Sequence, residues 1–135
     1  MTEHTCKKCQ SPLNDENCYN GWIKKSKYVC KFCARELNRT LRLQIKLETL
    51  KEYGSKCTCC NEDKIEFLSI DHIDGKGAEH RKSLGLDYGS DEKTVAGHNF
   101  YRWLKKNNYP KDNFQILCFN CNYAKHVYGT CPHQR

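Results

Sequence analysis

Apolar residues recur at helical intervals in two parts of the chain. Between Ala34 and about Tyr53 neither Gly nor Pro interrupts the pattern, and Gly54 supplies a stop signal. We therefore predict a helix over residues 34–53. A second helical stretch runs from about Lys93 to Asn107, where aromatic and aliphatic positions share one face and are expected to be core.

Two shorter apolar runs have the length and composition of strands. Residues 66–70 predict a strand that ends at Asp71-His72, and residues 114–117 predict a second strand that leads into Cys118. A helix is expected to begin near Asn122, and a glycine-containing loop region is expected after the first strand. This order of elements predicts a small α+β protein.

Composition limits how much of the stability an apolar core can supply. The chain has 135 residues, of which 38% are hydrophobic, and its mean hydropathy is -0.88. A chain of this size and polarity cannot bury a large apolar core. Because 11 residues are cysteine, bound zinc is expected to supply part of the stability.

Eight of the cysteines form four Cys-x-x-Cys pairs, the spacing that presents two sulfurs to one zinc ion. The first two pairs predict a four-cysteine zinc ribbon and the last two a second structural zinc site; the ligands are Cys6, Cys9, Cys30, Cys33, Cys57, Cys60, Cys118 and Cys121. Residues 28–30 are expected to approach the second pair in a strand-like conformation. Cys18 is expected to be a small buried residue, and Cys59 has no predicted role. Cys131 and His133 have ligand chemistry but no partner pair, so they are either alternative zinc donors or part of a tail that folds back.

Thiolate zinc sites persist in a reducing compartment, whereas an oxidised cysteine framework would not. The first residues contain no apolar run of the kind found in a signal peptide, and no stretch approaches the roughly 20 apolar residues of a membrane span. We therefore expect a cytoplasmic protein without a membrane partner.

Basic residues form a stripe on the predicted helix over residues 34–53. Plotted at about 100° per residue, Arg35, Arg39, Arg42 and Lys46 fall on one line with leucines on both sides. Such a ridge suits a helix lying along a phosphate backbone, although a charged stripe is often only a solvated face. The formal charge is +7, and two four-cysteine zinc sites would each subtract 2 and leave +3. The positions of the basic residues are therefore better evidence about the partner than the total charge.

A second basic group precedes the second predicted strand. It comprises Arg102 and Lys105, together with Lys106 and Lys111. Contacts of this kind would give affinity for nucleic acid without sequence information. The two basic groups support a nucleic acid as the partner.

Three segments resemble the motifs of the HNH endonucleases, also called His-Me finger or ββα-metal nucleases. They are Ile70-Asp71-His72-Ile73, Asn113-Phe-Gln-Ile-Leu-Cys118 and Cys121-Asn122-Tyr-Ala-Lys125. The zinc-bearing phage and prophage members are the most similar, and the resemblance covers roughly residues 57 to 133. Asn122 stands where the motif usually ends in His, as in the family's Asn-bearing variants.

The resemblance implies a role for each motif residue. His72 would be the general base that deprotonates water, and Asn113 would fix the orientation of that base. Asp71 and Asn122 would ligate one catalytic Mg2+ or Mn2+ ion. His126, four residues beyond Asn122, is either a third ligand of that ion or a surface histidine.

The resemblance also implies a reaction and a domain plan. The expected reaction is single-metal hydrolysis of DNA that leaves 5′-phosphate and 3′-hydroxyl ends, and His80 and Arg81 would contact phosphate near the cut. The plan is a zinc ribbon over residues 1–33, a basic linking helix over 34–53 and an HNH module over 54–135. The alternatives are a non-catalytic zinc-dependent nucleic-acid-binding regulator and a phage assembly or packaging partner on the same fold. A homodimer is a further option, and a phage-encoded chain would act in the host cytoplasm.

Overall fold

The computed structural model describes residues 4–85 and 96–134. Its contacts divide the chain into two compact units, Met1–Leu43 (unit 1) and Gln44–Arg135 (unit 2). The boundary falls inside helix α1 (Lys31–Glu52), so this helix supplies residues to both units. The boundary between the two units thus lies within the predicted linking helix and not at either of its ends.

Unit 1 has almost no apolar interior. Its buried residues, within the described range 4–43, are Cys6, Cys18, Cys30 and Ala34. The only extended pairing in that range is an isolated bridge between Thr5 and Pro12. A unit that buries three cysteines and one alanine cannot be held together mainly by the hydrophobic effect.

The strand-like approach expected at residues 28–30 is wrong. The N–H of Lys27 donates to the carbonyl of Trp22 at 2.8 Å, and the N–H of Val29 donates to the carbonyl of Lys27 at 3.0 Å. Because these backbone groups bond within the same short segment, they are not available to a ladder with another strand. Turns, rather than the strands of a ribbon, bring the cysteines together.

Helix α1 confirms the helix predicted from periodicity and begins three residues earlier than expected. It ends before Gly54, whose φ of +98° lies in the left-handed region that glycine adopts without strain. Within unit 2, Leu50 on this helix is only 1% exposed. Within unit 1, Leu37 and Leu43 are about half exposed and find no core to enter.

The sheet of unit 2 has two antiparallel strands, β1 (Leu68–His72) and β2 (Phe114–Cys118). Both predicted strands are confirmed. Strand β1 ends at Asp71-His72 as expected, but it begins at Leu68 because Ile65–Phe67 form a short 3-10 helix. Asp71 lies opposite Gln115 in the register. Because successive side chains of a strand point to opposite faces, Asp71 and His72 are presented to different sides of the sheet.

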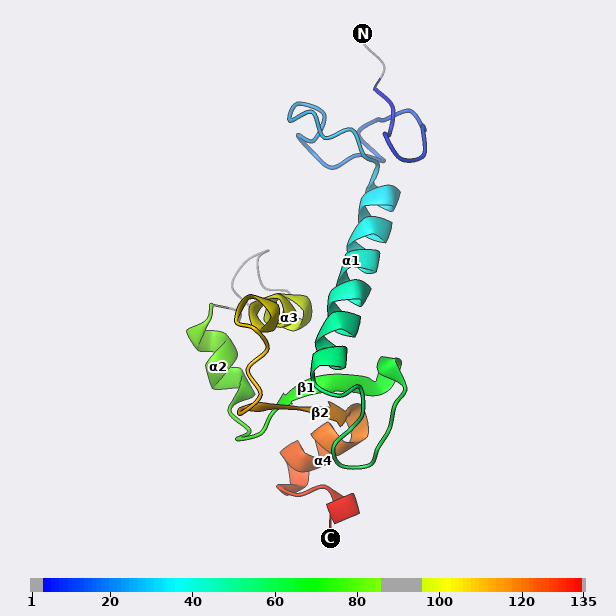
Figure 1. Cartoon of the computed structure of the whole chain (residues 1–135). Coiled ribbons are helices and arrows are strands. Elements are labelled where there is room, and N and C mark those ends of the chain that lie inside the picture. The colour runs from blue at the N-terminus through cyan, green and yellow to red at the C-terminus, as the bar shows by residue number, and fades with distance from the viewer. Residues whose placement is uncertain (1–3, 86–95, 135) are drawn as a thin grey trace. The chain divides into compact units, whose positions relative to one another are not determined.

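Three helices complete unit 2: α2 (Gly77–Ser83), α3 (Ala96–Lys106) and α4 (Phe119–Tyr128). The loop expected around His80 and Arg81 is wrong, because α2 occupies that segment. Gly77 stands at its first position, and the six residues that follow include no helix breaker. The predicted start of the second helical stretch, residues 93–95, lies outside the described residues. Figure 1 shows the sheet between α3 and α4.

Two apolar clusters support the sheet. One combines β1, β2 and the end of α1 with cysteines; its buried members are Leu50, Cys57, Leu68, Ile116, Leu117, Cys118, Cys121 and Cys131. The other joins α3 to the start of β2 through Phe100, Leu104 and Phe114. The protein is therefore a small α+β fold with a two-stranded sheet and cysteine clusters that could bind zinc. None of the helices within the described ranges is long and apolar enough to serve as a membrane span.

Candidate metal centres and candidate active site

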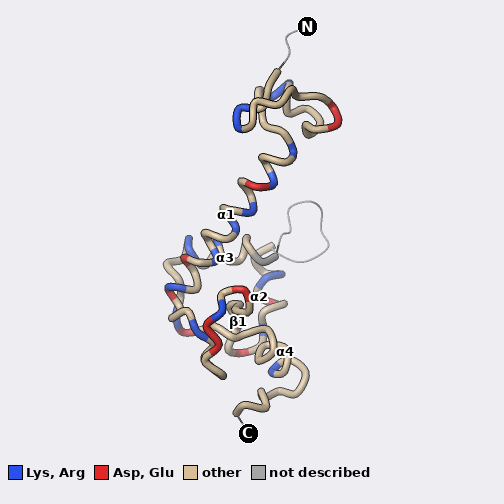
Figure 2. Tube along the Cα trace, turned by 90° about the vertical axis from the view of Figure 1, so that its right-hand side faces the viewer, with Lys and Arg blue, Asp and Glu red and all other residues tan. Residues whose placement is uncertain are grey.

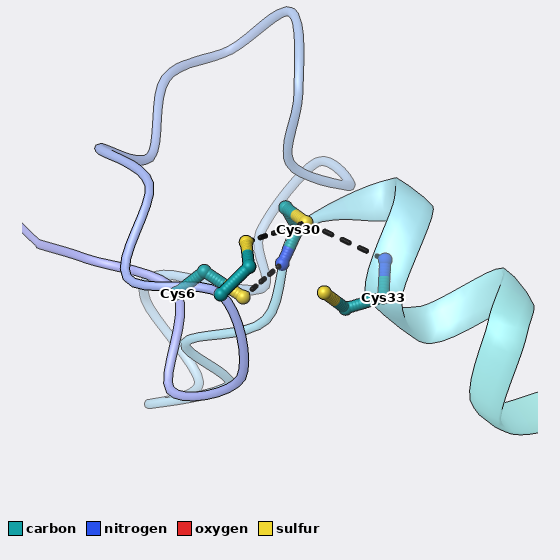
Figure 3. Close-up of side chains that lie close together, drawn as sticks. Cys6, Cys30 and Cys33 are labelled. Carbon is teal, nitrogen blue, oxygen red and sulfur yellow. Dashed lines mark hydrogen bonds between the residues drawn. The ribbon is translucent and has the colours of Figure 1, made fainter.

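The first cysteine cluster lies at the junction of the unit 1 turns with α1. The ligand atoms of Cys6, Cys9, Cys30 and Cys33 all lie within 4.8 Å of one another. Figure 3 shows the sulfurs converging, with Cys33 in the first turn of the helix. The Cys9 and Cys30 sulfurs are 3.7 Å apart, close to the roughly 3.8 Å edge of a zinc tetrahedron with ~2.3 Å bonds. The four predicted ligands are thus brought together in a set that could hold one zinc ion.

Electrostatics in this cluster favour a bound cation. A hydrogen bond from the backbone N–H of Cys30 lowers the pKa of the Cys6 thiol to about 6. Burial and the neighbouring sulfurs raise the pKa of Cys33 to about 12. One thiol therefore ionises readily while its neighbour resists ionisation, and a divalent ion would remove that conflict by neutralising both.

The second cluster ties β2 and the start of α4 to the turn that follows α1. Its ligand atoms, from Cys57, Cys60, Cys118 and Cys121, also lie within 4.8 Å of one another. The Cys118 sulfur caps α4 by accepting the N–H of Cys121 at 3.5 Å. The Cys60 and Cys118 sulfurs are 3.7 Å apart, again near the tetrahedral edge. The spacing correctly predicts that these two distant pairs meet.

The turn of the second cluster is fixed by backbone hydrogen bonds. The N–H of Thr58 donates to the carbonyl of Ile116 in β2 at 2.9 Å, and the N–H of Asn61 donates to that of Cys57 at 3.0 Å. Burial opposes ionisation of Cys57, but hydrogen bonds from the backbones of Cys118, Cys60 and Cys59 lower its pKa to about 7. The turn is therefore arranged to stabilise thiolate at its first cysteine.

A third group of ligand atoms adjoins the second cluster. Cys59, Cys121, Cys131 and His133 place one donor atom each within 4.8 Å of one another. The sequence predicts ligand chemistry for Cys131 and His133 but no partners, because Cys121 is already assigned to the second cluster and Cys59 belongs to no Cys-x-x-Cys pair. The missed signal is Cys59, the additional cysteine inside the Cys57–Cys60 turn.

Asp71 is a buried carboxylate with two close partners. The Lys125 ammonium donates to its Oδ2 at 2.6 Å, and the Gln115 amide donates to the same oxygen at 2.8 Å. Lys125 also donates to the backbone carbonyls of His72 at 2.8 Å and Ile73 at 3.1 Å. A single cation is thus held by three oxygens at the end of β1. Asp71 is 9% exposed, so its charge requires such compensation.

His72, 7% exposed, lies among aromatic rings on the other side of the strand. Its Nε2 is 2.9 Å from Nδ1 of His80, and its ring stacks on Phe100 with centroids 5.1 Å apart. Burial, and then the nearby positive charges of His80 and Arg81, lower the pKa of His72 below its usual 6.5. The ring is therefore neutral at neutral pH and can accept a proton.

Gly77 permits the approach of α2 to His72. A Cβ atom at this position would lie 2.9 Å from Nδ1 of His72 and 3.1 Å from the Arg81 guanidinium. Any larger residue would push the histidine or the helix away. The helix brings His80 against His72, a contact that the sequence expectation of a loop did not include.

One cavity of about 420 Å³ gathers most of the predicted active-site residues. Asp71, His72, Asn122 and His126 line it, together with Arg81 and Lys125. The Asn122 amide lies near Ser69 Oγ, at 3.4 Å. Strand β1 and helix α4 thus deliver residues more than 50 positions apart to one space.

Asn113 lies outside that cavity. Its backbone carbonyl accepts the N–H of Ile73 at 3.0 Å, which holds the segment after β1 against the start of β2. The residue lines a second cavity of about 430 Å³, together with His72, His80 and Trp103. His72 therefore contributes to both cavities, while Asn113 reaches only one.

The predicted DNA-contacting residues differ in how free their charges are. Arg35, Arg39, Arg42 and Arg102 are exposed, and Figure 2 shows basic positions recurring along α1. Lys46 is half-buried and lies over the Phe119 ring, 6.0 Å from its centroid. Lys105 forms an ion pair with Glu48 at 2.6 Å. The arginines thus have the more available charges.

Comparison of the chain with protein-family models, with curated proteins and with solved structures finds no match. The similarity to HNH endonucleases therefore rests on the sequence motifs quoted above. Function has to be inferred from the cavity residues and from the chemistry of the cysteine clusters.

Proposed function

We propose that the chain is a metal-dependent endonuclease that hydrolyses DNA phosphodiester bonds in the manner of the HNH, or ββα-metal, nucleases. The observation that carries this proposal is the shared cavity of Asp71, His72 and Asn122. A buried, neutral imidazole beside a carboxylate and an amide supplies a base and hard oxygen donors for one site. The motif order along the sequence supports the same reaction.

In this proposal His72 takes the proton from the attacking water. Its lowered pKa keeps the imidazole neutral, which is the form that accepts a proton. His80 acts as a positioning residue, because its ring contacts His72 Nε2 and restricts rotation of the base. Asn113 acts through its backbone, which holds the chain directly after β1.

The donor set fits a hard divalent cation such as Mg2+ or Mn2+. Both close contacts of Asp71 engage Oδ2, so Oδ1 is the carboxylate oxygen that would hold the ion. The amide oxygen of Asn122 would be the second protein ligand, and His126 would be a third. When bound, the ion would neutralise charge on the departing 3′ oxygen. The Lys125 ammonium would add positive charge beside the phosphate.

The two four-cysteine clusters act as structural zinc sites in this proposal. Each offers four sulfurs and no open position for substrate. The exposed arginines of α1, with Arg81 and Arg102, would contact the DNA backbone and provide affinity without sequence selection.

The test is cleavage of supercoiled plasmid by zinc-loaded protein, with Mg2+ or Mn2+ added or withheld. We expect metal-dependent nicked or linear product, and a roughly 10²- to 10⁴-fold lower rate for His72→Ala, the range that a general base contributes. Lys82→Ala, on the exposed side of α2, is the matched control and should cut normally. Equal zinc content and equal thermal stability of all three proteins would exclude misfolding as the cause.

One observation favours the non-catalytic alternative. Lys125 already compensates the charge of Asp71 at 2.6 Å, so the cavity does not require a divalent ion for charge balance. If the wild type and His72→Ala bind duplex, branched and single-stranded DNA equally and neither cuts, the chain is a nucleic-acid-binding module and the nuclease proposal fails.

A further inference from the structure

Cys121 belongs to two groups of metal-binding atoms at once. Its sulfur lies within 4.8 Å of the other three sulfurs of the second cluster, and also within 4.8 Å of the donor atoms of Cys59, Cys131 and His133. A cysteine thiolate has lone pairs for two metal ions. The two groups of donor atoms therefore share one sulfur.

We propose that unit 2 binds two zinc ions in one cluster, bridged by the Cys121 thiolate, with the second ion held by Cys59, Cys131 and His133. The chain would then bind three zinc ions in total, the third being in unit 1. This inference is independent of the nuclease proposal, because it concerns metal stoichiometry and not cleavage.

The distances in the added group suit zinc. The Nδ1 atom of His133 is 3.4 Å from the Cys121 sulfur and 3.4 Å from the Cys131 sulfur. A tetrahedral ion with bonds of ~2.3 Å to sulfur and ~2.0–2.1 Å to nitrogen separates those ligands by about 3.6 Å. The donor atoms thus stand almost at the spacing of a closed zinc site.

Charge balance also fits a second ion. Four thiolates around one zinc ion carry a formal charge of -2, because each ligand must lose its proton to bind. Adding Cys59 and Cys131 as thiolates contributes two negative charges, which a second zinc ion cancels. The enlarged cluster therefore buries no more net charge than the four-cysteine site alone.

The fold after α4 gives the second ion a structural task. The chain turns at Gly129, whose φ is +75°, and returns through a short 3-10 helix, Pro132–Gln134. Cys131 is 5% exposed, while the described residues after it are exposed. Little apolar surface is therefore available to hold this segment against the turn that carries Cys59. A shared ion would fasten it.

Native mass spectrometry of the full-length protein, freed of loose metal by gel filtration, tests the stoichiometry. We expect three zinc ions for the wild type and two for both His133→Ala and Cys131→Ser. Gln134→Ala and Cys18→Ser are the matched controls and should keep three, because neither residue belongs to a cluster in the described chain. Two ions in the wild type, or three in His133→Ala, would overturn the proposal.

Cadmium substitution tests the bridge in the wild type, so the outcome does not depend on whether a variant folds. Two of three 113Cd resonances should show scalar coupling to each other through the shared sulfur. The third resonance, from unit 1, should show none. Three uncoupled resonances would mean that Cys121 does not bridge, and two resonances would mean that the second ion is absent.

Discussion

Unit 1 and unit 2 bury different kinds of side chain. The buried residues of unit 1, within its described range, are cysteines and Ala34, whereas unit 2 buries Leu68, Ile116, Phe100 and other large apolar residues. Each unit nevertheless contains a four-cysteine cluster. The same ligand set therefore has to supply nearly all of the stability in one unit, and is added to an apolar core in the other.

Removing zinc should produce the largest difference in stability between the two units. After chelation we expect unit 1 to lose its ordered structure, since structural zinc is worth about 10–16 kcal/mol in small domains that cannot fold alone. The β1–β2 sheet should persist in a loosened form, because its apolar clusters remain. The indole N–H signals of Trp22 in unit 1 and Trp103 in unit 2 report on each unit in one NMR spectrum. Loss of both signals at the same chelator concentration would contradict the expected difference in stability between the two units.

A pair of cysteine variants tests whether the stability of unit 1 depends on its zinc ligands in particular. Cys30 and Cys18 are both buried, at 5% and 2% exposed, but among the described residues only Cys30 of the two belongs to a cluster. Cys30→Ser should abolish zinc binding in unit 1 and unfold it. Cys18→Ser should keep the ion and cost about 1–3 kcal/mol for burying a hydroxyl in place of a thiol. Zinc content and the Trp22 signal are the measurements, and equal loss in both variants would show that unit 1 depends on general packing.

The apolar core of unit 2 can be tested in the same paired manner. Ile116 in β2 is fully buried and Val127 in α4 is 47% exposed. Ile116→Ala should lower the free energy of unfolding by about 2–5 kcal/mol, while Val127→Ala should change it by about 0.5 kcal/mol or less. Denaturant unfolding with zinc present throughout, followed at Trp103, measures both. A small effect of Ile116→Ala would mean that zinc, rather than the apolar core, stabilises unit 2 as well.

The same contrast explains what the sequence could predict. Helical periodicity without Gly or Pro identified α1, although much of its apolar surface is exposed. Short apolar runs identified β1 and β2, which are largely buried. Pair spacing identified both four-cysteine clusters, since Cys-x-x-Cys is a local signal. The prediction of a strand-like approach to Cys30 failed because the described part of unit 1 contains no sheet for it to join. The segment forms turn hydrogen bonds and one bond to Lys7 instead.

Contacts between distant segments could not be predicted where no paired cysteine spacing marked them. The pairing of His72 with His80 depends on how α2 packs across the sheet end, which in turn depends on the absence of a side chain at Gly77. The grouping of Cys59 with His133 needs the chain to turn back after α4, and no spacing rule encodes that turn. Local sequence patterns therefore predicted the helices and strands. The site also depends on how these elements pack against one another, which the local patterns do not encode.

The smallest expected effect concerns the protonation of His72. Burial and the charges of His80 and Arg81 lower the pKa of His72 below 6.5. The unfolded chain therefore binds this proton at a higher pH than the folded one, and His72 makes unit 2 less stable as the pH falls through the unfolded value. Arg81→Ala should move the pKa of His72 back toward 6.5, because one nearby positive charge is removed.

Long-range 1H–15N spectra of the histidine rings measure this pKa directly, over a pH range in which zinc content is constant. Lys82→Ala removes the same charge from the exposed side of α2 and should leave His72 unchanged. Equal shifts in both variants would mean that overall charge, rather than the position of Arg81, sets the pKa. Titration of wild-type His72 above 6.5 would mean that Asp71, whose charge acts in the opposite direction, outweighs burial.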